Sequence, residues 1–162
     1  MKIIIRHSEK TDIAAIKNIY GQPDNYSGTL QLPYPSFDKW ETKLKNIPEN
    51  FHSLVAVVEN KVIGQLGMEV LTHPRRKHVA NIGMAVNELF KGKGAGTKLL
   101  EMAIDMAQNW VAVKRIELEV YTDNKSAIGL YKKHGFVMEG TAKNYAFRNG
   151  TYVDVFLMAK LL

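Results

Sequence analysis

Two patterns of hydrophobic and polar residues recur along this chain, and each predicts a different kind of element. Apolar runs bounded by polar residues are typical of strands, whereas apolar residues that repeat every three or four positions are typical of helices. The first pattern predicts five strands and a closing hairpin that turns at Asn149 and Gly150. The strands are expected at residues 2–9, 52–60, 61–72, 77–86 and 115–121, and the hairpin at residues 136–161.

Helical spacing of apolar residues recurs in four places. Helices are expected at residues 11–20, 36–47, 95–110 and 124–134. Gly135 suits the left-handed position that ends the last of them. Residues 21–35 carry glycine, proline, asparagine and serine together with aromatic side chains, which predicts a long loop of the kind that often serves function.

The order of these elements predicts the fold class. We expect one α/β (α+β) domain over residues 1–162, with a mixed, mostly antiparallel and twisted sheet of about seven strands flanked by about four helices. A chain of 162 residues is long enough to bury one sizeable core. Gly83, inside a predicted strand, marks a bulge or a place where another backbone approaches closely.

The composition of the chain indicates where the protein is located and which classes of ligand it can bind. The chain has no cysteine, and its single N-terminal apolar run, three isoleucines long, is too short for a signal peptide or a membrane span. We therefore expect a cytoplasmic protein without a membrane partner. The net charge of +6 favours an anionic partner, but the chain lacks the basic and aromatic patterns of nucleic-acid binders and any zinc-ligand spacing. Neither nucleic acid nor a metal ion is expected as a ligand.

The segment FKGKGAGTKLL, residues 90–100, places three glycines ahead of a predicted helix. A nucleotide-triphosphate loop needs lysine followed by serine or threonine, whereas here Thr97 precedes Lys98. The dinucleotide fingerprint needs G-x-G-x-x-G, whereas the spacing here is G-x-G-x-G. Two alternatives stay open: a pyrophosphate cradle of another kind, formed by bare N–H groups at a helix N-terminus, and a flexible loop with solvated lysines.

A second motif, NKSAIGLYKKHGF at residues 124–136, favours the cradle. Its residues match the pattern N-x-x-A-x-x-x-Y-x-x-x-G-F, and the glycine segment resembles the R/Q-x-x-G-x-G/A loop, with Lys91 where arginine or glutamine is usual. Together the two motifs resemble the Gcn5-related N-acetyltransferase (GNAT) family. The element order and closing hairpin are similar to the branch that acetylates free L-amino acids or similar small amines.

The resemblance implies acetyl-CoA as co-substrate and a set of residues that bind it. Their backbone would hold the pantetheine arm and the pyrophosphate, and Asn124 would either contact pantetheine or cap its helix. Tyr131 is implied as the catalytic acid that protonates the leaving thiolate. The implied cofactor-binding residues are Met84, Ala85, Val86, Lys91, Gly92, Lys93, Gly94, Ala95, Gly96, Thr97, Asn124, Ala127 and Tyr131.

The acceptor side is less defined by the sequence. The resemblance places the acceptor pocket near the loop at 26–35 and the final hairpin, with Tyr34 and Tyr145 as candidate substrate contacts. Arg75, beside Arg76, is the candidate partner for a substrate carboxylate. The strand at 77–86 has no carboxylate, so the general base stays open among Glu69, Glu119, His73 and His78. The expected activity is acetyl transfer to a small amine. Acetylation of a protein or peptide and a non-catalytic acyl-CoA sensor are alternatives, and monomer and homodimer both stay open.

Overall fold

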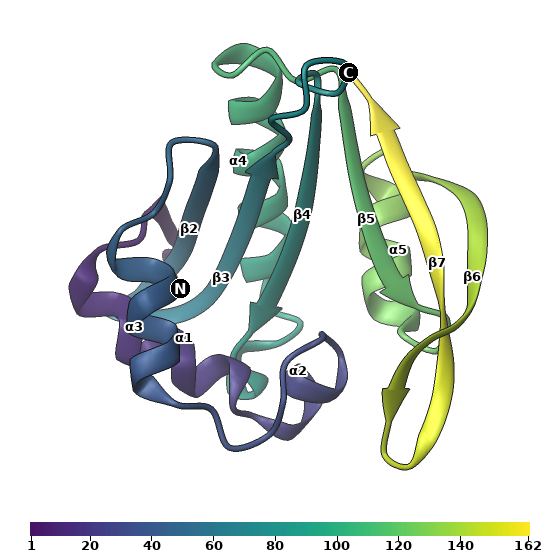
Figure 1. Cartoon of the computed structure of the whole chain (residues 1–162). Helices are drawn as coiled ribbons and strands as arrows, with labels where there is room; N and C mark the ends of the chain where they lie inside the picture. The colour runs from purple at the N-terminus through teal and green to yellow at the C-terminus, as the bar shows by residue number, and fades with distance from the viewer.

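A single twisted sheet of seven strands, in the order β1-β2-β3-β4-β5-β7-β6, organises the molecule (Figure 1). The computed structural model describes all of residues 1–162. All neighbouring strands are antiparallel except β4 and β5, which run parallel. The strands are β1 (Ile4–His7), β2 (Phe51–Val58), β3 (Lys61–Val70), β4 (Val79–Val86), β5 (Arg115–Tyr121), β6 (Val137–Arg148) and β7 (Thr151–Leu161).

Five α-helices surround this sheet. They are α1 (Ile13–Tyr20), α2 (Pro23–Ser27), α3 (Phe37–Lys45), α4 (Ala95–Asn109) and α5 (Lys125–Lys133). Buried residues of α1 and α3 form one apolar cluster with β2 and β4, while buried residues of α4 and α5 form a second, larger cluster. These four helices therefore lie in two layers on opposite faces, as Figure 1 shows, whereas α2 lies at the end of the sheet. None of them is long and apolar enough to cross a membrane.

The predicted fold class is confirmed: the sheet is mixed, mostly antiparallel and seven-stranded. The count of helices was one short, because α2 lies inside the segment that we expected to be a loop. Its five residues, PDNYS, contain a proline suited to the first turn but too few apolar positions to show a helical period. The expected bulge at Gly83 is wrong, since β3 and β4 stay in continuous register there.

The parallel pairing of β4 with β5 is short. It joins only Val79 to Arg115, Ala80 to Ile116 and Asn81 to Glu117. Beyond Asn81 the two strands separate, β4 staying with β3 and β5 staying with β7. Figure 1 shows them meeting at one end and diverging toward the other. The middle of the sheet therefore has two inner edges that no strand pairs.

The segment around α2 spans the wide end of this opening. Asn25 donates from Nδ2 to the carbonyl of Val86 at 2.9 Å, which ties the segment to β4. The hydroxyl of Tyr121 donates to the carbonyl of Thr29 at 2.9 Å, which ties it to β5. Arg148 of β6 donates to the carbonyl of Ser27 at 3.3 Å. We call residues 22–31 the strap, because these bonds hold it across both separated strands.

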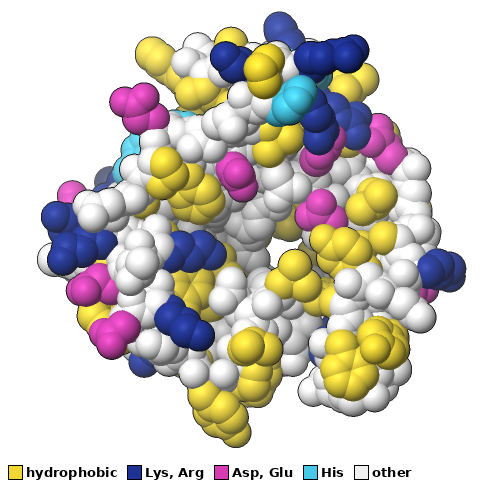
Figure 2. All heavy atoms as spheres, in the orientation of Figure 1, with side chains coloured by type: hydrophobic (Ala, Val, Ile, Leu, Met, Phe, Trp, Pro, Cys, Tyr) yellow, Lys and Arg dark blue, Asp and Glu magenta, His cyan; other side chains and the backbone are white.

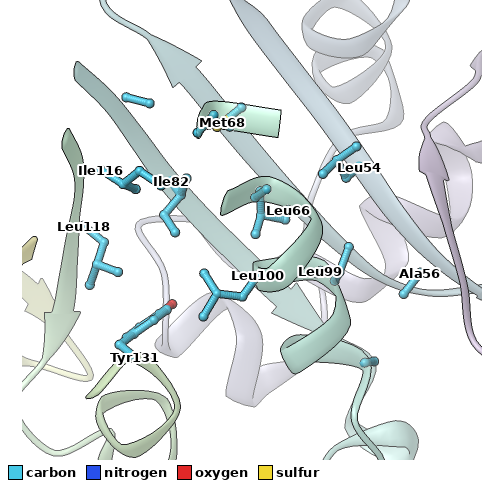
Figure 3. Close-up of a cluster of buried hydrophobic side chains, with 14 of the residues drawn as sticks. Leu54, Ala56, Leu66, Met68, Ile82, Leu99, Leu100, Ile116, Leu118 and Tyr131 are labelled. Atoms are coloured by element: carbon cyan, nitrogen blue, oxygen red, sulfur yellow. The ribbon is translucent and has the colours of Figure 1, made fainter. Parts of the chain in front are cut away.

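The main apolar cluster between α4 and the sheet should dominate stability. Leu100 on α4 is fully buried and faces the strand residues of that cluster (Figure 3). We expect Leu100→Ala to lower the free energy of unfolding by about 2–5 kcal/mol, because it leaves a cavity in a close-packed region. Urea denaturation would measure it, with Leu89→Ala as control, since Leu89 is 78% exposed. Equal effects of the two substitutions would contradict the proposed position of the core.

Candidate active site

The separated strands enclose a cavity of about 650 Å³. This volume lies within the usual range for small-molecule sites, roughly 300–1,000 Å³. Its walls come from β4, β5, the strap, the first turn of α4 and the side of α5 that carries Tyr131. In Figure 2 the same face of the molecule is hollowed at its centre, with acidic side chains at the rim of the hollow. Elements distant in sequence thus converge on one site.

The backbone of β4 presents free hydrogen-bonding groups to this cavity. The N–H of Asn87 donates to the carbonyl of Ile63 in β3, whereas the carbonyl of Val86 points the other way, toward Asn25 of the strap. Because successive residues of a strand direct their N–H and C=O groups to opposite sides, those of Met84 and Ile82 share the side of Val86. No strand pairs with that side after Asn81. Its N–H donors are therefore available to a ligand.

This alternation separates the three predicted cofactor-binding residues of β4 into two groups. Met84 and Val86 direct backbone groups into the opening, whereas the backbone of Ala85 pairs with Gln65 of β3. Ala85 lines the cavity, but its side chain packs in the apolar cluster of α1 and α3. Ile82 also lines the cavity. Sequence reasoning missed it, because only the point where β4 and β5 separate reveals which residues lose their partners.

The glycine segment forms the turn that begins α4. Gly92 and Gly94 have φ values of +74° and +91°, a region that residues with a Cβ rarely adopt. Gly94 is the N-cap of α4, a helix of fifteen residues, and no side chain caps its first turn. The N–H groups of Ala95, Gly96 and Thr97 therefore lack helical partners and carry the positive end of the helix dipole. All three residues line the cavity.

Gly96 serves a different purpose from the other two glycines. A Cβ at Gly96 would lie 3.4 Å from Leu130 of α5 and 3.8 Å from the sulfur of Met84, whereas a Cβ at Gly92 or Gly94 would meet no atom within 4 Å. Gly96 thus allows α4, α5 and β4 to approach one another. Gly92 and Gly94 supply backbone conformation and leave open space where a ligand can approach.

Tyr131 lies on α5 with its ring 5.7 Å from that of Phe136, centroid to centroid. Only 7% of the residue is exposed, and burial raises the pKa of its phenol to about 12. Its hydroxyl has no hydrogen-bond partner within the protein, but it is not completely enclosed by protein atoms. Tyr131 lines the cavity, so the hydroxyl faces its open space. Figure 3 shows the ring extending from α5 toward the sheet, beside Leu118.

Asn124 begins α5 and also lines the cavity. Its Oδ1 accepts a hydrogen bond from the N–H of Ala127 at 3.2 Å, so of the two roles open to it the helix cap is present. The side-chain amide has no further bond within the protein. Ala127 lies on the cavity wall beside it.

Some candidate residues lie outside the cavity. Lys93 does not line the cavity, and its ammonium lies 5.2 Å above the ring of Phe90. Lys91, by contrast, lines the cavity, with its ammonium 3.5 Å from a carboxylate oxygen of Asp24. Tyr34 is 95% exposed. Neither Tyr34 nor Arg75 lines the cavity or the pocket described next, whereas Tyr145 lies on the cavity wall.

A smaller pocket, of about 190 Å³, joins the cavity through residues that border both spaces. The shared residues are Thr29, Asn81, Gly83 and Met84. A Cβ on Gly83 would meet no atom within 4 Å, so the missing side chain leaves open space among these shared residues. Sequence reasoning identified Gly83 as unusual but assigned the wrong reason. The pocket lies on the α1 and α3 face of the sheet.

The helical wall of this smaller pocket is a stack of side chains. Lys43 holds its ammonium 4.9 Å above the ring of Trp40, and Trp40 stacks on Tyr20 at 4.8 Å. The hydroxyl of Tyr20 donates to Oε1 of Gln65 at 2.6 Å, and Gln65 donates to Ser53 at 3.0 Å. Sequence reasoning predicted the helix at residues 36–47 but missed this wall, because α1, α3 and β3 meet only in the folded chain.

Two carboxylates flank the junction of the two spaces. Glu69 lines the smaller pocket and Glu119 lines the cavity, while Asn81 borders both. The side-chain amide of Asn81 lies 3.4 Å from each carboxylate oxygen of Glu119. His73 and His78 line neither space. Of the four base candidates, only the two glutamates are near the site, and no group of side chains is arranged to hold a metal ion.

Comparison with known proteins identifies the family. The model of the Acetyltransferase (GNAT) family matches residues 14–136, which include β4, the glycine segment and α5. The chain belongs to the GNAT family. GNAT members use acetyl-CoA, and this GNAT chain is an acetyl-CoA-dependent N-acetyltransferase.

Individual relatives of this GNAT chain differ in what they act on. An L-amino acid N-acetyltransferase of Escherichia coli (strain K12) is 45% identical over 160 residues, 99% of this chain and 98% of that protein. A spermidine N(1)-acetyltransferase of Vibrio cholerae is 28% identical over 95% of this chain and 90% of that protein. The crystal structure of a ribosomal-protein-alanine N-acetyltransferase from Brucella melitensis has a TM-score of 0.87 and 26% identity, covering 98% and 99% of the two chains.

The GNAT cavity fits acetyl-CoA on the evidence of its own groups. Free N–H donors at the start of α4 suit a pyrophosphate, free backbone groups on β4 suit an amide-bearing arm, and exposed Lys91 adds positive charge near the glycine turn. The thioester of the bound donor supplies the activated acetyl group.

The turn at Gly94 should be required for donor binding. We expect Gly94→Val to raise the Kd of coenzyme A at least about tenfold, because a branched residue disfavours φ of +91° and its side chain would occupy the open space before the helix. Isothermal titration calorimetry would measure it. As a control, Gly129→Ala on the exposed side of α5 should leave binding unchanged. An unaltered Kd in Gly94→Val would refute the cradle.

Proposed function

We propose that this enzyme transfers the acetyl group of acetyl-CoA to the α-amine of a free L-amino acid. The observation that carries the proposal is the pocket of about 190 Å³ that joins the cavity at Gly83 and Met84. Such a pocket suits a small acceptor. The 45% identity to an L-amino acid N-acetyltransferase, over nearly all of both chains, supports the same acceptor class.

The donor is held by backbone groups in two places. The N–H groups of residues 95–97 bind the pyrophosphate, and Lys91 adds charge beside them. The free N–H groups of Met84 and Val86 bind the pantetheine arm and the thioester carbonyl. An N–H directed at that oxygen stabilises the negative charge that develops during transfer, an effect worth about 2.7–4 kcal/mol in well-studied acyl-transfer sites.

Tyr131 acts as the general acid in this proposal. The phenol keeps its proton at neutral pH, since burial raises its pKa to about 12. The ordinary pKa of a thiol, about 8.5, is lower than that of this phenol, so Tyr131 would not protonate a well-solvated thiolate. A thiolate that leaves within the enclosed site is poorly solvated and therefore more basic, which favours proton transfer from Tyr131. The unpartnered hydroxyl facing the cavity supports this role.

The acceptor amine must lose a proton before or during transfer. Glu69 and Glu119 flank the junction where the amine would lie. Either carboxylate can accept that proton, directly or through a water molecule, and Asn81 orients Glu119 by its contacts of 3.4 Å. We propose these two residues in place of the histidines, which lie outside the site.

Acetyl-CoA is a metabolite of the cell interior, which supports a cytoplasmic place of action.

Protein or peptide acetylation and acyl-CoA sensing are the alternatives. A peptide acceptor would have to extend from the smaller pocket past the strap, and the strap is bonded to both separated strands. A sensor would not need Tyr131 or an open passage at Gly83. A matched assay would distinguish all three functions.

Thiol release from acetyl-CoA should be measured with L-amino acids, spermidine and peptides as acceptors. We expect the highest kcat/KM with one or more L-amino acids, and mass spectrometry should find the acetyl group on the α-nitrogen. Faster turnover of peptides than of any amino acid would overturn the proposed acceptor. Tight binding of coenzyme A without turnover of any acceptor would instead indicate a sensor.

The proposed acid gives a separate expectation. Tyr131→Phe should lower kcat by about 10²-fold or more and leave the Kd of coenzyme A nearly unchanged, because the ring is kept and only the proton donor is lost. Tyr152→Phe, at an exposed position on β7, is the matched control and should behave as the wild type. Because the phenol pKa is about 12, ionisation of Tyr131 should cause no loss of kcat below about pH 11. Full activity of Tyr131→Phe would remove the proposed acid.

A further inference from the structure

The smaller pocket carries a positive charge that has no partner in the protein. Lys43, on α3, lines this pocket, and none of the ion pairs of the chain includes it. The residue as a whole keeps exposed surface, but its ammonium lies 4.9 Å above the ring of Trp40. Burial lowers the pKa of Lys43, and no acidic side chain opposes that effect. A bound anion would compensate the charge.

The position of Lys43 is fixed by the residues beneath it. Trp40 stacks on Tyr20, whose hydroxyl donates to Gln65 in a bond of 2.6 Å between two buried side chains. Lys43 is thus the outermost member of this stack, and its ammonium contacts a ring that is itself held by Tyr20. An ordered cation loses less entropy when it binds a ligand.

The opposite side of the pocket is acidic. Glu69 lines it from β3, and Asn81 and Gly83 of β4 lead from there to the cavity, where Glu119 lies. In β3 and β4, Glu69 is the direct cross-strand neighbour of Asn81, so the two side chains share the α1 and α3 face. The pocket therefore combines a lysine on its helical wall with a carboxylate on its sheet wall. A free amino acid carries the complementary pair of charges on one carbon.

We propose that Lys43 binds the α-carboxylate of the acceptor and thereby selects free amino acids over polyamines. This inference rests on the proposed function and adds the residue that determines the acceptor class. With the carboxylate at Lys43, the α-amine lies within the same small pocket as Met84, where the acetyl group is presented. A polyamine would bring a second positive charge toward Lys43, which is unfavourable at close range.

This assignment replaces the arginine that the sequence suggested for the carboxylate. Arg75 lines neither space, and its neighbour Arg76 is paired with Glu117 at 2.5 Å. Lys43 was not singled out in the sequence because it belongs to a helix with two other lysines and an amphipathic pattern. Only the stack on Trp40 distinguishes it from them.

The test compares each amino acid with the amine that lacks its carboxylate. Suitable pairs are L-leucine with 3-methylbutylamine and L-phenylalanine with 2-phenylethylamine, and spermidine is added as a polyamine. For Lys43→Met we expect KM for the amino acids to rise roughly 10- to 100-fold, as for loss of a hydrogen bond between charged groups. The kcat at saturation and the constants for the decarboxylated amines should change little.

Lys43→Met keeps the stem over Trp40, so loss of packing is separated from loss of charge. Lys43→Arg should retain most of the preference for amino acids, whereas Lys43→Glu should reverse it toward spermidine. Lys39→Met, on the same helix but outside the pocket, is the matched control and should leave every constant unchanged. The Kd of coenzyme A and the melting temperature of each variant show that the donor site and the fold are intact.

Two results would overturn the proposal, and they differ from failure of the proposed function. If wild-type enzyme prefers amino acids and Lys43→Met keeps the same ratio of kcat/KM between each amino acid and its decarboxylated amine, Lys43 does not bind the carboxylate. An equal rise of KM for amino acids and amines would also contradict it, because that pattern indicates general damage to the pocket. If the wild type acetylates spermidine or peptides but no amino acid, the proposed function itself fails.

Discussion

The three residue pairs that join β4 to β5 set the geometry of the whole site. While these pairs hold the two halves of the sheet together, the separation beyond Asn81 leaves backbone donors of β4 without partners. In most sheets such unpaired edges are hidden or blunted, because they invite other strands. Here they lie inside the molecule, enclosed by α4, α5 and the strap, where a ligand can take the place of the missing strand.

The strap links the two spaces that this opening creates. Asn25 and Thr29 connect it to β4 and β5, and Thr29 borders both the cavity and the smaller pocket. Its entry is fixed to the turn before the glycine segment as well, since Gln22 accepts a hydrogen bond from the N–H of Glu88 at 3.0 Å. The proposed donor and acceptor sites thus share one short segment. A change in its position would alter both.

Much of the proposed donor site could be predicted from sequence because its turn and helix starts follow local backbone rules. Glycine readily adopts the positive φ values seen at Gly92 and Gly94, and Asn124 caps a helix that its own neighbours form. The acceptor side depended on contacts between distant segments. Tyr20, Lys43 and Gln65 are more than twenty residues apart in sequence, and no local pattern shows that they share one wall.

The central claim is that acetyl-CoA binds along the free edge of β4 and at the start of α4. Amide hydrogen exchange measured residue by residue, with and without coenzyme A, tests it directly, because each N–H reports its own protection. The N–H groups of Met84, Val86 and residues 95–97 should gain protection on binding, while those of the outer edge strand β6 should not. Protection confined to other surfaces, with these amides unchanged at saturating coenzyme A, would contradict the account.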